Sequence, residues 1–135
     1  MVDIYPQAGV RWDDGEEDEM LHHIQCGTTT HQVAVNSGRS HRAIILQLTS
    51  CYDENRFHVI SDVVLNPNGH ELERINNAWT NPEWDILIEE FVQGLPIDAI
   101  MARHNRTRAA IAYALAALLD RHFAGIQINA RGGEV

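Results

Sequence analysis

Two groups of arginines are the residues whose type and spacing are best suited to bind another molecule. All ten cations of the chain are arginine, and lysine is absent. An arginine donates hydrogen bonds in a planar fork, which grips a phosphate or the edge of a guanine. The groups therefore predict a contact with nucleic acid, unless they pair with acidic residues of the same chain. Their members are Arg39 and Arg42 in the first half, and Arg103, Arg106 and Arg108 in the second.

The overall charge works against a nucleic-acid contact. The net charge is -9, with 19 acidic residues among 135, and an acidic chain repels a phosphate backbone at long range. Six acidic residues crowd the segment 13–19, where they suit the first turn of a helix because they complement its dipole. No Gly-rich phosphate loop, nucleophile elbow or metalloprotease helix is present, so we expect no enzymatic activity and no cofactor.

A zinc site and a membrane segment are two further classes that the sequence bears on. His22, His23, Cys26 and His31 lie close together, and His22 and Cys26 have the i, i+4 spacing of a metal pair. No Cys-x-x-Cys supports zinc, so we expect surface histidines and no metal. The chain has no apolar run of about 18 residues and no basic-then-apolar start, so we expect a cytoplasmic protein without membrane contact.

A repeat of 67 residues sets the positions of these side chains. Trp12–Asp53 lies on Trp79–Asp120 without a gap, which is typical of a duplicated structural unit. We therefore expect repeat one at 1–61, a linker at 62–77 and repeat two at 78–135. The identical pairs are Trp12/Trp79, Glu16/Glu83, Asp18/Asp85, Gly27/Gly94, Arg39/Arg106, Ala43/Ala110, Ile44/Ile111, Leu48/Leu115 and Asp53/Asp120.

Capping signals and apolar periodicity predict three helices in each repeat. In repeat two, Thr80 to Glu83 forms a capping box, and apolar residues then recur at helical spacing until Gly94 ends the helix. A short helix, a tight turn at Asn105 and a third helix capped by Thr107 follow. The predicted core of this repeat is Trp79, Leu87, Phe91, Ile100, Ile111 and Leu115.

Repeat one predicts the same order with other residues. Asp13 and Glu16 stand for the capping box, Gly38 for the turn and Ser40 for the cap of the third helix. Each third helix is followed by a strand-like tail, at 56–60 and at 122–128, and the two tails either pair with each other or form small wings. The predicted fold is therefore mainly α, with two tandem three-helix helix-turn-helix units and short β segments.

Both repeats resemble the Myb/SANT-like helix-turn-helix family, and the second repeat carries the clearer motif. Its members commonly begin Trp-Thr-x-x-Glu-x-x-x-Leu and open a third helix on Arg-Thr or Arg-Ser before Ala-Ile. The later family tryptophans are absent, and Leu48 and Leu115 hold the third helices instead. The family includes DNA-binding and protein-binding members, so the resemblance leaves the partner open. It rests on Trp79-Thr80-Asn81-Pro82-Glu83-Trp84-Asp85, Leu87, Gly94, Ile100, Ala102, Arg106-Thr107 and Ala110-Ile111.

The leading hypothesis for function is a small transcriptional regulator that reads one site of double-stranded DNA with both repeats. In a helix-turn-helix, the first turn of the third helix contacts bases and phosphates in the major groove. The residues expected there are Arg39, Ser40, His41, Arg42, Arg103, Asn105, Arg106, Thr107, Arg108 and Tyr113.

The alternative hypothesis is an acidic module that binds a basic or nucleic-acid-binding protein. The expected outward faces of the third helices are apolar, which is typical of protein contacts. These faces bury against the other repeat, the tails or a second chain as a dimer. An inhibitor encoded by a phage or mobile element, acting by masking or by DNA mimicry, fits this hypothesis. The expected contact residues are Leu46, Tyr113, Asp13, Asp14 and Glu17.

Overall fold

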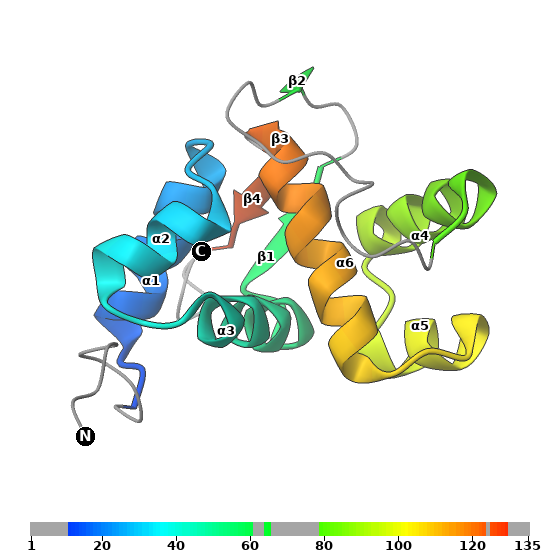
Figure 1. Ribbon diagram of the computed structural model, residues 1–135, viewed down its shortest axis with the longest axis horizontal. Coiled ribbons are helices and arrows are strands. Elements are labelled where there is room, and N and C mark those ends of the chain that lie inside the picture. Colours follow the sequence, from blue (N-terminus) through cyan, green and yellow to red (C-terminus); the bar gives the residue numbers. More distant parts are fainter. Residues whose placement is uncertain (1–10, 61–63, 66–78, 124, 130–135) are drawn as a thin grey trace.

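The protein is mainly helical, and its described residues form six helices and four short strands (Figure 1). The computed structural model describes residues 11–60, 64–65, 79–123 and 125–129, so most of the expected linker lies outside the described residues. The elements are α1 (Asp14–Gln25), α2 (Thr30–Ser37), α3 (His41–Asp53), β1 (Phe57–Val59), β2 (Val64–Leu65), α4 (Asn81–Gln93), α5 (Ile97–His104), α6 (Arg108–Arg121), β3 (His122–Phe123) and β4 (Ile126–Ile128).

The helices begin where the capping residues predict. α4, α5 and α6 each start 67 residues after α1, α2 and α3. Gly38 (φ 71°) and Asn105 (φ 53°) adopt the left-handed conformation that ends α2 and α5, a conformation that glycine and asparagine tolerate best. Five caps satisfy a backbone N–H three residues further on; they are Asp13, Thr29, Ser40, Thr80 and Thr107.

One hydrophobic core joins the two halves of the chain. Five of the six side chains predicted for the core of repeat two are fully buried, and Trp79 packs on the core while partly exposed. Side chains of both halves belong to the same cluster, so neither half has a core of its own. Members from the two halves include Leu21, Ile44 and Leu48, together with Leu87, Phe91 and Leu115.

Helix α6 lies at the centre of the molecule. It packs against α2, α3 and α5, and Figure 1 shows it between the helices of the first half and α4 with α5. From Ile111 to Asp120 every residue except Tyr113 is buried. A helix that is apolar on all sides belongs inside a protein, and the many alanines of α6 let neighbouring helices approach it closely.

The two third helices pack against each other through equivalent faces. Ile45 of α3 lies in one buried cluster with Ala112 and Ala116 of α6. Ala112 is the repeat equivalent of Ile45, and Ala116 is the equivalent of Thr49, which is also buried. An interface that uses the same patch of both partners has twofold symmetry. The halves are therefore related to each other like the subunits of a dimer.

Two aspartates at equivalent positions make equivalent hydrogen bonds between the halves. Asp53, near the end of α3, accepts a hydrogen bond from the backbone N–H of Ile97 at 3.2 Å. Its equivalent Asp120 in α6 accepts one from the backbone N–H of Thr30 at 2.7 Å. Ile97 and Thr30 are themselves equivalent, and each opens the second helix of its half. Each half thus satisfies an orphan N–H at a helix start of the other half.

The strand-like tails pair with each other. β1 and β4 are antiparallel, with Phe57 opposite Ile128, and β2 pairs with β3 in the same sense. β1 packs on α4 and β4 packs on α1, so each tail lies on the first helix of the other half. Within the described residues, no helix is long and apolar enough to cross a membrane.

Candidate functional site

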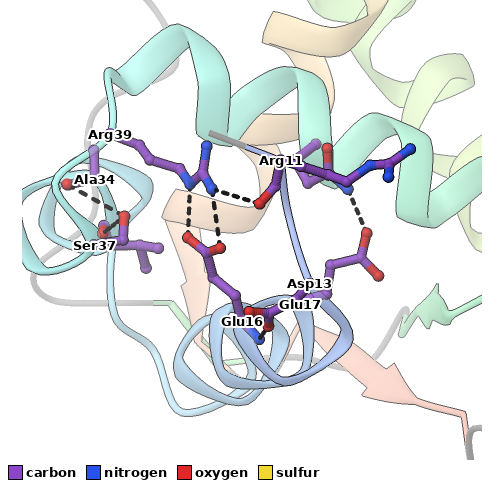
Figure 2. A network of polar contacts seen from close by, with 9 residues as sticks. Arg11, Asp13, Glu16, Glu17, Ala34, Ser37 and Arg39 are labelled. Carbon is purple, nitrogen blue, oxygen red and sulfur yellow. Dashed lines mark hydrogen bonds and ion pairs between the residues drawn. The ribbon is translucent and has the colours of Figure 1, made fainter. Parts of the chain in front are cut away.

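Arg39 is the first of the residues expected to contact DNA, and its side chain is directed into the protein. It is only 4% exposed. Its Nε and Nη2 bind the two carboxylate oxygens of Glu16 at 2.6 and 2.9 Å, as Figure 2 shows. The guanidinium also lies 4.2 Å from the centre of the Trp12 ring. A forked ion pair with a cation–π contact ties the turn before α3 to the start of α1.

Arg106 repeats this arrangement in the second half. Its Nη2 binds Glu83 at 3.0 Å, and its guanidinium lies 4.1 Å from the centre of the Trp79 ring. Partial burial acts to raise the pKa of Glu83, but hydrogen bonds from Arg106 and His104 outweigh it, and the pKa is lowered. The three residues that form each site are identical in the two repeats, and this identity was the signal in the sequence for the contact.

His104 extends the network of the second half. Its Nε2 lies 2.6 Å from Glu90 and its Nδ1 lies 3.3 Å from Glu83. The ring therefore lies between two carboxylates, one near each of its nitrogens. Glu90 is buried, and Arg103 lies 2.9 Å from its second oxygen. This cluster was not expected from the sequence, because repeat one has other residues at three of its four positions.

The remaining residues expected to contact DNA are divided between structural roles and solvent. Arg108 pairs with Asp53 at 2.9 Å. The hydroxyls of Ser40 and Thr107 accept hydrogen bonds at the starts of their own helices. Asn105 forms the tight turn, and Arg42, in the first turn of α3, is exposed.

His41 lies in a polar cluster between the halves. Its ring stacks on His31 with 3.7 Å between centroids, and its Nε2 lies 2.6 Å from the hydroxyl of Thr30. That hydroxyl donates to Asp120 at 2.8 Å. Since the Thr30 proton goes to the carboxylate, His41 is the donor in this pair. The cluster corresponds to the ion pair between Arg108 and Asp53 in the other half.

The residues expected for protein binding also have mixed surroundings. Leu46 is 37% exposed, and Tyr113 is half-buried against the cluster between α3 and α6. Asp13 caps α1 and Asp14 is exposed. Glu17 binds Arg56 at 2.6 Å and accepts a hydrogen bond from Gln47. Asp13 and Glu17 of the acidic segment therefore hold the fold, and Asp14 lies at the surface.

The histidines near Cys26 do not assemble with other ligands. The Sγ of Cys26 lies 3.8 Å from Nε2 of His22. In the part of the chain that the structure describes, no group of three metal-ligating side chains is found.

Comparison with known proteins gives no relative: no family model, no curated protein and no solved structure matches the chain. The site is therefore interpreted from its own geometry.

Proposed function

We propose that the chain is a protein-binding module in which two helix-turn-helix halves form one body and a basic protein binds its outer surface. The observation that carries this proposal is the packing of α3 on α6. It buries Ile45, Ala112 and Ala116, on the faces that a helix-turn-helix protein would turn toward a groove of DNA. Arg39 and Arg106, which would reach phosphates, are held by carboxylates of the chain itself.

The charge of the outer surface supports a basic partner. The chain has a net charge of -9. Asp14 and Glu19 on α1 and Asp85 and Glu89 on α4 are all exposed. Complementary charge steers the encounter of two proteins and raises the association rate more than the affinity. The two acidic first helices are therefore expected to attract a basic partner.

Exposed apolar side chains supply the other part of such an interface. Val35 on α2, Leu46 on α3 and Ile86 on α4 are 73%, 37% and 53% exposed. Binding energy concentrates in a few large side chains that become buried in a complex. Single exposed apolar residues are common, so each needs its own test as an anchor.

The proposal is tested with the full chain as bait in a nuclease-treated lysate of its source cells, followed by kinetics with the purified partner. Val35→Asp and Leu46→Asp should each speed dissociation about tenfold, the effect of losing about 1.4 kcal/mol. Gln32→Asp adds the same charge at an exposed position of α2 and should leave dissociation unchanged. Loss of the complex after nuclease treatment, or equal effects of the three variants, would overturn the proposal.

DNA binding is the second candidate, because Arg42 is exposed in the first turn of α3. If α3 lies on DNA, Arg42 contacts phosphate. The affinity should then fall with salt, and Arg42→Ala should reduce the log–log slope by roughly 0.9 per lost phosphate contact. Absence of duplex binding at about 50 mM salt would exclude this candidate in favour of the protein partner.

A further inference from the structure

A small pocket opens between α1 and α2 in the first half. Its volume is about 80 Å³, and its lining includes Trp12, Glu16, Met20, His23 and Ser37. A cavity of about 150 Å³ holds a benzene molecule. The pocket is therefore too small for a drug-sized ligand, but it has room for the planar end of one side chain.

The equivalent positions of the second half show which side chain is missing from this pocket. The position of Ser37 corresponds to His104, and the position of His23 corresponds to Glu90. In the second half the imidazole of His104 fills the space between α4 and α5 and lies 5.6 Å from the Trp79 ring, edge to face. In the first half a serine stands there instead.

Ser37 leaves the space open because its side chain is short and turned back on its own helix. Its hydroxyl donates to the carbonyl of Val33 at 2.8 Å, with Ala34 also in reach at 3.3 Å. Figure 2 shows a dashed line between Ser37 and Ala34, with Arg39 and Glu16 in the same view.

The pocket keeps two of the three groups that contact His104 in the second half, an indole ring and a carboxylate, while His23 replaces Glu90. Trp12 and Glu16 are the equivalents of Trp79 and Glu83, which contact His104. Glu19 also lines the pocket, with 74% of its side chain exposed. An aromatic ring and carboxylates favour a guanidinium or an imidazolium, because both carry a delocalised charge and N–H donors in one plane.

We propose that this pocket binds a planar cationic side chain, an arginine or a protonated histidine, presented by a protein partner. The occupant takes the place that His104 holds in the second half. That the side chain belongs to a partner rests on the proposed function, whereas the chemistry of the pocket is testable without any partner.

The test is an NMR titration of the full chain with blocked amino acids. N-acetyl-arginine amide, and N-acetyl-histidine amide at about pH 5, should shift the Trp12 indole N–H and the Met20 methyl signals and reach saturation. Affinities of about 1 mM are expected for ligands of this size. N-acetyl-lysine amide has the same charge without the plane and should bind at least about fivefold more weakly, because its ammonium cannot match the planar fork.

Substitutions at the pocket test whether the NMR shifts come from binding at this site. Ser37→His should abolish the shifts by filling the space, and His104→Ser should create a second site that the Trp79 indole N–H reports. Glu19→Gln, at a position with 74% of its side chain exposed, should weaken arginine binding severalfold. Glu89→Gln removes the same charge from an exposed position of α4 and should change nothing.

Three results would overturn the inference: no saturable shift at Trp12, equal binding of the lysine probe, or arginine binding that both Ser37→His and Glu19→Gln leave intact. If the arginine probe binds and no protein partner is found, the pocket stands and the proposed function fails. If a partner binds and neither substitution weakens it, the partner does not use the pocket, and this inference fails while the proposed function stands.

Discussion

The two halves anchor the start of the third helix in different ways. In the first half Arg39 binds both carboxylate oxygens of Glu16 on the first helix, and it is almost completely buried. In the second half Arg106 and His104 share Glu83, and the side chain of Arg106 is 23% exposed. The same three-residue site therefore carries one charge pair in one half and part of a larger network in the other.

This difference lies in contacts that each half makes within itself. The contacts between the halves keep equivalent positions, because a change at Asp53 or Asp120 disturbs a helix start in the other half. The space between the first and second helices belongs to one half alone. It holds a histidine in the second half and a pocket in the first.

The largest expected effect on stability tests whether the two halves unfold as one cooperative unit. Leu48 and Leu115 are equivalent and fully buried, so Leu48→Ala and Leu115→Ala should each cost about 2–5 kcal/mol of stability. Thermal unfolding followed by circular dichroism and by tryptophan fluorescence should give one coincident transition for both variants. Two separate transitions would show that each half has its own core.

The next largest expected effect is a difference in the stability lost when each of the two aspartates at the interface between the halves is replaced. Asp120 is buried and accepts two hydrogen bonds from Thr30, so Asp120→Ala should cost about 2–3 kcal/mol. Asp53 is more exposed and accepts one longer bond from Ile97, so Asp53→Ala should cost about 1 kcal/mol, as for a helix cap. Urea unfolding of both variants measures the difference, and equal losses would contradict the described geometry.

The two anchoring arginines should also differ in the stability lost on substitution, though by less than the two aspartates. Replacing the more buried residue of the pair should again cost more. Arg39→Ala should cost about 1–3 kcal/mol, because it removes a buried, forked bond to a carboxylate. Arg106→Ala should cost about 1 kcal/mol or less, since the pair is more exposed and His104 still binds Glu83. Arg42→Ala, at an exposed position, serves as the control and should stay within about 0.5 kcal/mol of the parent.

The smallest expected effect is the dependence of protein stability on pH that Glu83 confers. Its pKa in the folded protein is lowered, so the unfolded chain binds a proton more readily. The resulting stability is present above the unfolded pKa and is lost as the pH falls through the folded value. The parent should therefore lose more stability than Glu83→Gln between about pH 5 and pH 3. Parallel pH profiles in urea unfolding would remove Glu83 from the account.

Much of the local structure could be predicted from the sequence. Caps such as Thr80 and Thr107, and the turns at Gly38 and Asn105, act within a few residues, so their effects are readable from neighbouring positions. The apolar spacing likewise predicted the buried side of α1, α2, α4 and α5.

Contacts between distant segments could not be predicted in the same way. The sequence places Arg39 before a third helix, but only the packed chain shows that its side chain is directed to Glu16 rather than to solvent. The apolar face with Ile45 left three partners open, and the structure shows the other repeat. The pairing of β1 with β4 and the role of Asp120 depend in the same way on how the halves meet.

The contact between the two third helices is the central claim, and a methyl NOE experiment tests it most directly. In protein labelled at isoleucine and alanine methyls, cross-peaks should join Ile45 to Ala112 and Ala116, which share one buried cluster. They should persist unchanged when duplex DNA is added at about 50 mM salt, where phosphate contacts are strong. Absence of these cross-peaks, or their loss on addition of DNA, would show that the faces are free to bind a groove and would contradict the account.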